Sequence, residues 1–183
     1  MIKKEFNQSI CATLHEFSDL EPQEQELIKS AIHARTKAQA PYSNFTVGVA
    51  VVSAQGTTHH GCNVERCTWT QTTHAEQNAV DSMISQCGPV KITLIALAGA
   101  PANHSIELNK KPSTSCITKP EEATLPCGHC RQIIWENCLE DPTVKILALT
   151  KHGDVLVTTI GDIYPMRFGP EHLGITYQTS NQP

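Results

Sequence analysis

The sequence lacks any apolar run of the about 18 residues that a membrane-spanning helix requires. The nearest candidate, Ile92 to Ala102, is too short. A secretory signal is also missing, because Lys3, Lys4 and Glu5 are followed by no continuous apolar region up to Phe17. These absences argue against a membrane partner and predict a soluble protein of the cytoplasm.

An excess of basic residues is absent as well. The chain has 14 Lys and Arg against 18 Asp and Glu, so its formal charge is -4 and its pI is near 6.1. Such a balance provides no positive surface for a nucleic acid or an anionic membrane. We therefore expect no nucleic-acid partner and favour a small or neutral ligand.

Cysteine, in contrast, is abundant, with eight residues in the chain. In a small secreted protein this number would suggest disulfides, but the lack of an export signal favours reduced thiols. We expect six of the eight to be free thiols without a further role: Cys11, Cys62, Cys67, Cys87, Cys116 and Cys138.

A chain of 183 residues is long enough for one well-buried domain and short for two. We expect an N-terminal extension at residues 1–20, with no ordered element before residue 10 and a short helix within 10–17. One domain should then follow at 21–183. Residues 99–124 have little periodicity, which predicts a long inserted loop within that domain. No internal repeat is present.

Apolar periodicity predicts alternating helices and strands in this domain. The four-residue connection 151–154 is too short for a crossover, so the last two strands should be antiparallel. Ligands collect at the carboxyl ends of strands in open α/β sheets, and two of the helices begin after strands. The expected helices are 21–40 (with Asp19 as cap), 73–86 (capped by Thr72 or Thr73) and 127–138; the expected strands are 46–53, 57–63, 90–98, 143–150 and 155–160.

Two short motifs contain residue types that commonly bind metal ions or take part in catalysis. The first is His74-Ala75-Glu76 and the second is Pro126-Cys127-Gly128-His129-Cys130. Together they supply an imidazole, a carboxylate and two thiols in the order H-x-E, then P-C-x-x-C about fifty residues later, which is the zinc deaminase signature.

These residue types fit a catalytic zinc ion, which takes three N or S ligands and leaves one corner open for water. His74, Cys127 and Cys130 supply the three. In a helix, Glu76 would point away from His74 and would remain free for proton transfer. The two cysteines, three residues apart in a first helical turn, lie where the helix dipole favours the thiolate. Two thiolates and a neutral imidazole also cancel the charge of the dication.

Other interpretations of the second motif remain open. The C-x-x-C pair could belong to a closed structural zinc site or to a redox pair. His129, between the thiols, is a further candidate ligand. In a binding module without activity, Cys116 or His104 of the long loop could occupy the fourth corner.

Five blocks of sequence resemble the cytidine deaminases: PYSNFTVGVAV, GCNVE, THAEQNAV, PCGHCRQ and FGPEHL, from about Pro41 to Leu173. The motifs HAEQ and PCGHCRQ are most similar to those of the dimeric, two-domain branch with a His-Cys-Cys ligand set. This chain, however, has the length of one domain. The resemblance implies an α/β fold of three layers, α/β/α, with a mixed five-stranded sheet in the catalytic domain 21–183. It also implies one Zn²⁺ per subunit. The family has only a short connection where this chain has 99–124.

The resemblance further implies substrate-binding roles for five residues. Asn63 and Glu65 would hold the ribose hydroxyls, and Phe45 would pack on the nucleoside. The Ala75 N–H would meet the pyrimidine carbonyl, and the Leu125 carbonyl would meet the departing amine. Without the family match, Phe45 could be a core residue, Asn63 a turn former and Glu65 a solvated charge.

A sixth role involves a neighbouring chain. In the family's tetramers the Phe of the F-G-P motif reaches into the site of another subunit, a role that would fall to Phe168, which could otherwise be a core residue. A single domain that resembles half of a pseudo-fourfold assembly favours a homotetramer over a dimer.

The resemblance implies hydrolytic deamination of cytidine and/or deoxycytidine to uridine or deoxyuridine plus ammonia, in pyrimidine salvage. Bound zinc makes water reactive at neutral pH, while Glu76 acts first as base and then as acid. Alternatives are a deaminase of another aminopyrimidine nucleoside or nucleotide, such as a nucleoside antibiotic, and an inactive zinc-stabilised binding module.

Overall fold

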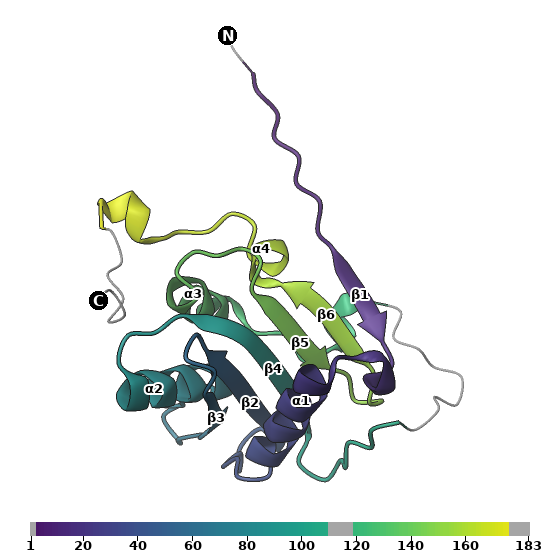
Figure 1. Ribbon diagram of the computed structural model, residues 1–183. Helices are drawn as coiled ribbons and strands as arrows, with labels where there is room; N and C mark the ends of the chain where they lie inside the picture. Colours follow the sequence, from purple (N-terminus) through teal and green to yellow (C-terminus); the bar gives the residue numbers. More distant parts are fainter. Residues whose placement is uncertain (1–2, 110–118, 176–183) are drawn as a thin grey trace.

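The computed structural model describes residues 3–109 and 119–175, which form a six-stranded sheet covered by helices on both faces (Figure 1). The strands are β1 (Ala12–His15), β2 (Phe45–Ser53), β3 (Thr58–Cys62), β4 (Ile92–Pro101), β5 (Lys145–Leu149) and β6 (Val155–Thr159). The helices are α1 (Pro22–Arg35), α2 (Ala75–Cys87), α3 (Gly128–Asn137) and α4 (Ile160–Ile163), with 3₁₀ turns η1 (Phe17–Asp19), η2 (Pro120–Glu122) and η3 (Pro170–Leu173).

The strand order is β1-β6-β5-β4-β2-β3. Strands β4 and β5 run parallel, and every other neighbouring pair is antiparallel. The sheet is therefore mixed, as predicted, and the hairpins β2–β3 and β5–β6 are both antiparallel. The parallel pair requires a crossover, which α3 provides.

The predicted number of strands, five, is wrong because residues 12–15 add a sixth. Ile10, Leu14 and Phe17 have helical spacing, yet β1 pairs along β6, with Leu14 opposite Leu156. Without β1 the backbone groups on that side of β6 would lack partners in the sheet, and pairing them outweighs a weak local helix preference. Residues 3–9 are exposed and belong to no helix or strand.

Two buried clusters separate the three predicted layers. On one face α1 packs over β2 and β4, with Ile28, Ala31 and Ala50 in its cluster. On the other face α2 and α3 cover the sheet, with Met83 and Ile134 fully buried. The N-cap of α1 is Glu21 instead of Asp19, since Glu21 and Glu24 form a capping box.

A close approach of backbones fixes α2 on the sheet. A Cβ atom at Gly61 of β3 would collide with the backbone N of Ala79 and the backbone O of Ala75. Only glycine permits this contact, and it brings the first turn of α2 directly against the sheet. The position of that turn relative to the sheet matters, because the turn contains Glu76 and follows directly after His74.

Of the predicted loop 99–124, the structure describes residues 99–109 and 119–124. Strand β4 continues to Pro101, and η2 lies near the other end. Within the described ranges all seven cysteines are free, which confirms five of the six predicted thiols; Cys116 lies outside those ranges. No helix there combines the length and the apolar character needed to cross a bilayer.

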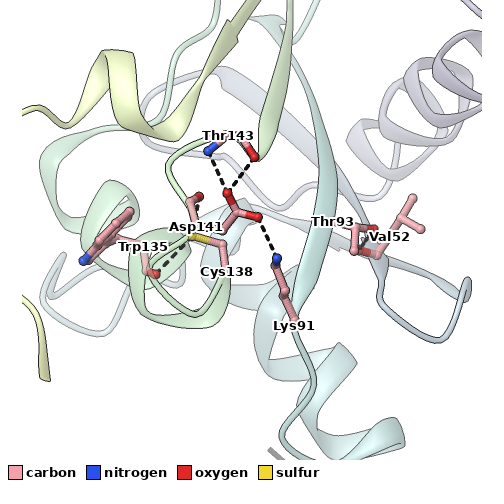
Figure 2. A network of polar contacts seen from close by, with 7 residues as sticks. All are labelled: Val52, Lys91, Thr93, Trp135, Cys138, Asp141 and Thr143. Atoms are coloured by element: carbon pink, nitrogen blue, oxygen red, sulfur yellow. Dashed lines mark hydrogen bonds and ion pairs between the residues drawn. The ribbon is translucent and has the colours of Figure 1, made fainter. Parts of the chain in front are cut away.

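An ion pair ties the turn after α3 to the segment before β4 (Figure 2). Lys91 Nζ lies 2.6 Å from Asp141 Oδ2, and the Thr143 backbone N–H and hydroxyl donate to Oδ1 at 2.9 and 2.6 Å. The bonds from Lys91 and Thr143 lower the pKa of Asp141 to about 2, against an ordinary 3.8. Nearby, burial raises the pKa of the Cys138 thiol to about 11, so this thiol stays protonated.

The Asp141 cluster predicts an acid-sensitive contribution to stability. Because the folded pKa is below the unfolded one, the contribution is complete above pH 3.8 and disappears as the pH falls through about 2. Asp141 is 29% exposed, so solvent screening limits the contribution to about 1–2 kcal/mol. We expect Asp141→Asn to lower the unfolding free energy by that amount at pH 6, with the difference from wild type closing at pH 2, measured by urea denaturation. Lys91→Met should reproduce most of the loss, whereas a difference independent of pH would contradict this account.

Candidate active site

The two motifs meet because each lies at the N-terminus of a helix. His74 is the N-cap of α2 and Cys127 is the N-cap of α3, both with extended backbone. The helices therefore begin slightly later than predicted, at Ala75 and Gly128. His74 and Glu76 are separated by this change of backbone at the cap, not by the turn of a continuous helix.

Three side-chain atoms from these segments form a compact triangle. His74 Nδ1 lies 3.5 Å from Cys127 Sγ and 3.3 Å from Cys130 Sγ, and the two sulfurs are 3.6 Å apart. A tetrahedral zinc ion with Zn–S near 2.3 Å and Zn–N near 2.0 Å requires separations of about 3.5 Å between nitrogen and sulfur and about 3.8 Å between the sulfurs. Among the described residues, these three side chains form the group of His, Cys, Asp or Glu that could hold a metal ion. The predicted zinc ligands fit the ion in both donor type and spacing.

The Cys130 thiol needs a cation to become a thiolate. Burial, followed by the charges of Glu76 and Cys127, raises its pKa. The helix dipole that was expected to favour the thiolate is thus outweighed by desolvation. A dication between the two sulfurs would reverse the balance, because a coordinating thiol is deprotonated.

Glu76 lies beside the metal group without belonging to it. Glu76 lies in the first turn of α2 and is only 6% exposed. Burial raises the pKa of its carboxyl group, although its own backbone N–H, a hydrogen bond with Cys130 and the charge of His74 oppose that effect. A carboxyl group with a raised pKa next to a three-residue metal group is suited to both accepting and donating a proton.

A cleft of about 280 Å³ opens beside these groups. Five of the six residues predicted to bind substrate line it together with the metal site. The lining residues are Phe45, Val47, Asn63, Glu65, Thr72, His74, Ala75, Glu76, Thr124, Leu125 and Cys127. Val47, Thr72 and Thr124 were not predicted, although Val47 could have been found, since it is two residues after Phe45 on β2 and so faces the same side.

Glu65 is held in place by the backbone of the segment before β2. Its Oε2 accepts from the N–H groups of Tyr42 at 2.8 Å and Ser43 at 3.2 Å. Burial would raise the pKa of Glu65, but the bonds from Ser43 and Tyr42 outweigh it and lower that pKa. The cleft wall therefore has a fixed negative charge at Glu65.

Asn63 is engaged with β2. Its Oδ1 accepts from the Val47 N–H at 2.8 Å, and its Nδ2 donates to the Phe45 carbonyl at 2.9 Å. One N–H and one lone pair of the amide remain for another partner. The interpretation of Asn63 as a simple turn former is incomplete, because its side chain continues the edge of the sheet into the cleft.

Phe168 is not brought into the cleft of its own chain. Its side chain stacks on His172 with ring centroids 5.1 Å apart, and the residue is 52% exposed. Two other candidate ligands lie outside the metal group: His104 Nε2 is 3.0 Å from the Lys151 carbonyl oxygen, and the His129 ring is T-shaped to the His74 ring with centroids 5.6 Å apart. Cys116 lies outside the described residues.

Comparison with known proteins consistently finds cytidine deaminases. Residues 21–145 match the model of the cytidine and deoxycytidylate deaminase zinc-binding region. Cytidine deaminases of Sporosarcina psychrophila and Halalkalibacterium halodurans are 30% and 32% identical over 81% of this chain, and the alignments cover 93% and 96% of those proteins. A crystal structure of cytidine deaminase from Burkholderia pseudomallei is 35% identical with a TM-score of 0.62, covering 78% of this chain and 97% of that one. With the His-Cys-Cys triangle at two helix N-termini, these matches establish that the chain belongs to the zinc-binding cytidine and deoxycytidylate deaminase family.

Proposed function

We propose that this protein is a zinc-dependent deaminase of cytidine and/or deoxycytidine, releasing ammonia and leaving uridine or deoxyuridine. The observation that carries the proposal is one cleft whose wall includes His74 and Cys127 of the metal group. The same wall contains buried Glu76, which is outside that group, and the Glu65 carboxylate. A metal group alone would suit many reactions. An uncoordinated acid beside it and a polar sugar-binding wall favour hydrolysis of a nucleoside.

The roles of the chain's own groups follow from their positions. When bound by His74, Cys127 and Cys130, zinc supplies a Lewis acid that activates water. Glu76 accepts one proton from the attacking water and passes it to the ring nitrogen N3 as the water oxygen bonds to C4. Glu76 then moves the remaining hydroxyl proton to the amine, so that the C4–N bond breaks, ammonia leaves and C4 keeps the oxygen as a carbonyl. The Ala75 N–H and the Leu125 carbonyl orient the pyrimidine from the two sides.

At the sugar, Asn63 offers its free amide groups and Glu65 its carboxylate to the ribose hydroxyls, with Phe45 packing on the nucleoside. A free nucleoside fits better than a nucleotide, because no Lys or Arg is among the described residues that line the cleft. The fixed charge of Glu65 would repel a phosphate.

The direct test is an ultraviolet assay of purified protein with cytidine, deoxycytidine and deoxycytidine 5′-monophosphate in parallel. We expect turnover of one or both nucleosides with uridine or deoxyuridine and ammonia as products, and little turnover of the monophosphate. Preference for the monophosphate would instead support the nucleotide alternative. Full zinc content without turnover of any aminopyrimidine nucleoside would support the inactive binding module.

Glu65→Gln tests the sugar-binding role. Replacing a charged hydrogen-bond acceptor by a neutral amide should raise KM for cytidine about 10–100-fold, because bonds to charged groups contribute about 1.5–3 kcal/mol. The metal content should stay at one zinc per chain. Glu26→Gln, on the exposed face of α1, is the matched control and should leave KM unchanged. An unaltered KM in Glu65→Gln would remove this residue from the substrate site.

The proposal includes a homo-oligomer, with a tetramer favoured over a dimer. The support is a run of exposed apolar side chains near the C-terminal end of the described residues: Met166, Phe168, Leu173 and Ile175. In a tetramer Phe168 would reach a neighbouring cleft. Light scattering tests the assembly, and a monomer would remove this role. A place in cytoplasmic pyrimidine salvage belongs to the same proposal.

A further inference from the structure

A small apolar cluster next to the cleft includes a side chain of β1, the strand that precedes the residues matched by the family model. Leu14 and Leu125 both pack against three buried residues, Ala123, Ala148 and Leu156. Leu14 of β1 lies opposite Leu156 of β6, which in turn lies opposite Ala148 of β5. One apolar row therefore crosses three strands and meets the segment that contains Leu125.

Leu125 belongs to both the cluster and the cleft. It packs against the cluster and also lines the cleft wall. Its segment is attached to the sheet, since Ala123 forms an antiparallel bridge with Thr150. Leu125 precedes Cys127 by only two residues, so a displacement of Leu125 would be felt at the substrate wall and close to the metal group.

Strand β1 is fixed firmly enough to serve as a support. Beyond its backbone pairing with β6, the Thr158 hydroxyl donates to the Cys11 carbonyl at 2.8 Å, and the Cys11 N–H donates to Asp162 at 2.9 Å. Phe17, just after the strand, is buried in the cluster beneath α1. Figure 1 shows β1 beside β6 at the edge of the sheet.

We propose that β1 is a positioning element of the active site, in which Leu14 supports the cluster that holds Leu125 in the cleft wall. The inference rests on the proposed function, in which the Leu125 carbonyl accepts from the departing amine. That interaction strengthens as the amine gains a proton, so it matters more in the transition state than in the bound substrate. Loosening Leu125 therefore lowers kcat more than it raises KM.

Leu14→Ala tests the proposal, with Thr13→Ala as the matched control. Thr13 lies on the same strand, is exposed, and points to the other face. We expect Leu14→Ala to lower kcat about 3–10-fold with KM changed less than about twofold. Thr13→Ala should match wild type in both, and Leu14→Ile should restore most of kcat. In a Leu125→Ala background, Leu14→Ala should lower kcat less than it does in the wild-type background, because its effect on kcat acts through the packing of Leu125 on the shared cluster.

Hydrogen exchange provides a readout that needs no turnover. The peptide 123–127 should exchange faster in Leu14→Ala than in wild type, and at the wild-type rate in Thr13→Ala. If Leu14→Ala fails to fold, Leu14→Val carries the same comparisons with a smaller loss of volume. Wild-type kcat and wild-type exchange in the Leu14 variant would overturn the inference, as would an equal loss in Thr13→Ala. If wild-type protein is inert towards cytidine, the proposed function fails, and the exchange comparison alone decides the role of β1.

Discussion

Glu76→Gln is expected to abolish turnover while leaving the zinc in place. The amide has nearly the same shape but can neither accept a proton from water nor deliver one to the amine. General acid–base catalysis contributes about 10²–10⁴-fold, and Glu76 is assigned both halves of it, so kcat should fall at least about 10³-fold. The assay is uridine formation from cytidine, with metal content measured on the same samples.

The matched control for Glu76 is Asp81→Asn, a carboxylate on the exposed side of the same helix, α2. It should retain wild-type kcat and KM. A Glu76→Gln protein that binds zinc and keeps a tenth of the activity would assign the proton transfers to another group.

Cys130→Ser should have the second large effect, the loss of the metal itself. Cys130 is fully buried, and its sulfur lies within 3.6 Å of both other ligand atoms. Serine is a poor zinc ligand, so zinc content should fall from one per chain to less than about 0.1, with activity lost in proportion. Zinc bound to the native state also stabilises it by mass action, so the melting temperature should drop.

Cys87→Ser provides the control for Cys130→Ser. Cys87 is a free thiol at the far end of α2, about 18 Å along the helix axis from its first residue. This variant should keep its zinc and its activity. Full zinc occupancy in Cys130→Ser would mean that the metal is held elsewhere.

The ligand set was predictable because zinc chemistry restricts it strongly. Few residue types bind zinc, and H-x-E with P-C-x-x-C supplies them in the needed number. The cleft wall was predicted less completely. Thr72 and Thr124 line it through the positions of their backbones, and nothing in a threonine marks such a place. Val47 could have been inferred from its spacing of two residues after Phe45 on β2. The role proposed for Phe168 would require a neighbouring chain, and within its own chain this side chain stacks on His172 instead of lining the cleft.

Local patterns also account for most of the fold. The runs that form β2, β4 and β5 are rich in apolar and β-branched residues, and their strand character is independent of their partners. Strand β1 was missed because its pairing partner, β6, lies far along the chain. The start of α2 at Ala75 depends likewise on tertiary contacts, since Gly61 brings the sheet backbone against it.

The sequence alone predicted the zinc motif, its three candidate ligands, the separate carboxylate and the family, because these depend on side-chain chemistry and on short spacings along the chain. Three features came from the folded chain instead: β1 completes the sheet, Leu125 is shared between a cluster and the cleft, and burial raises the pKa of Cys130. Those features arise from contacts between distant segments, and contact and desolvation energies exist only once the chain has folded.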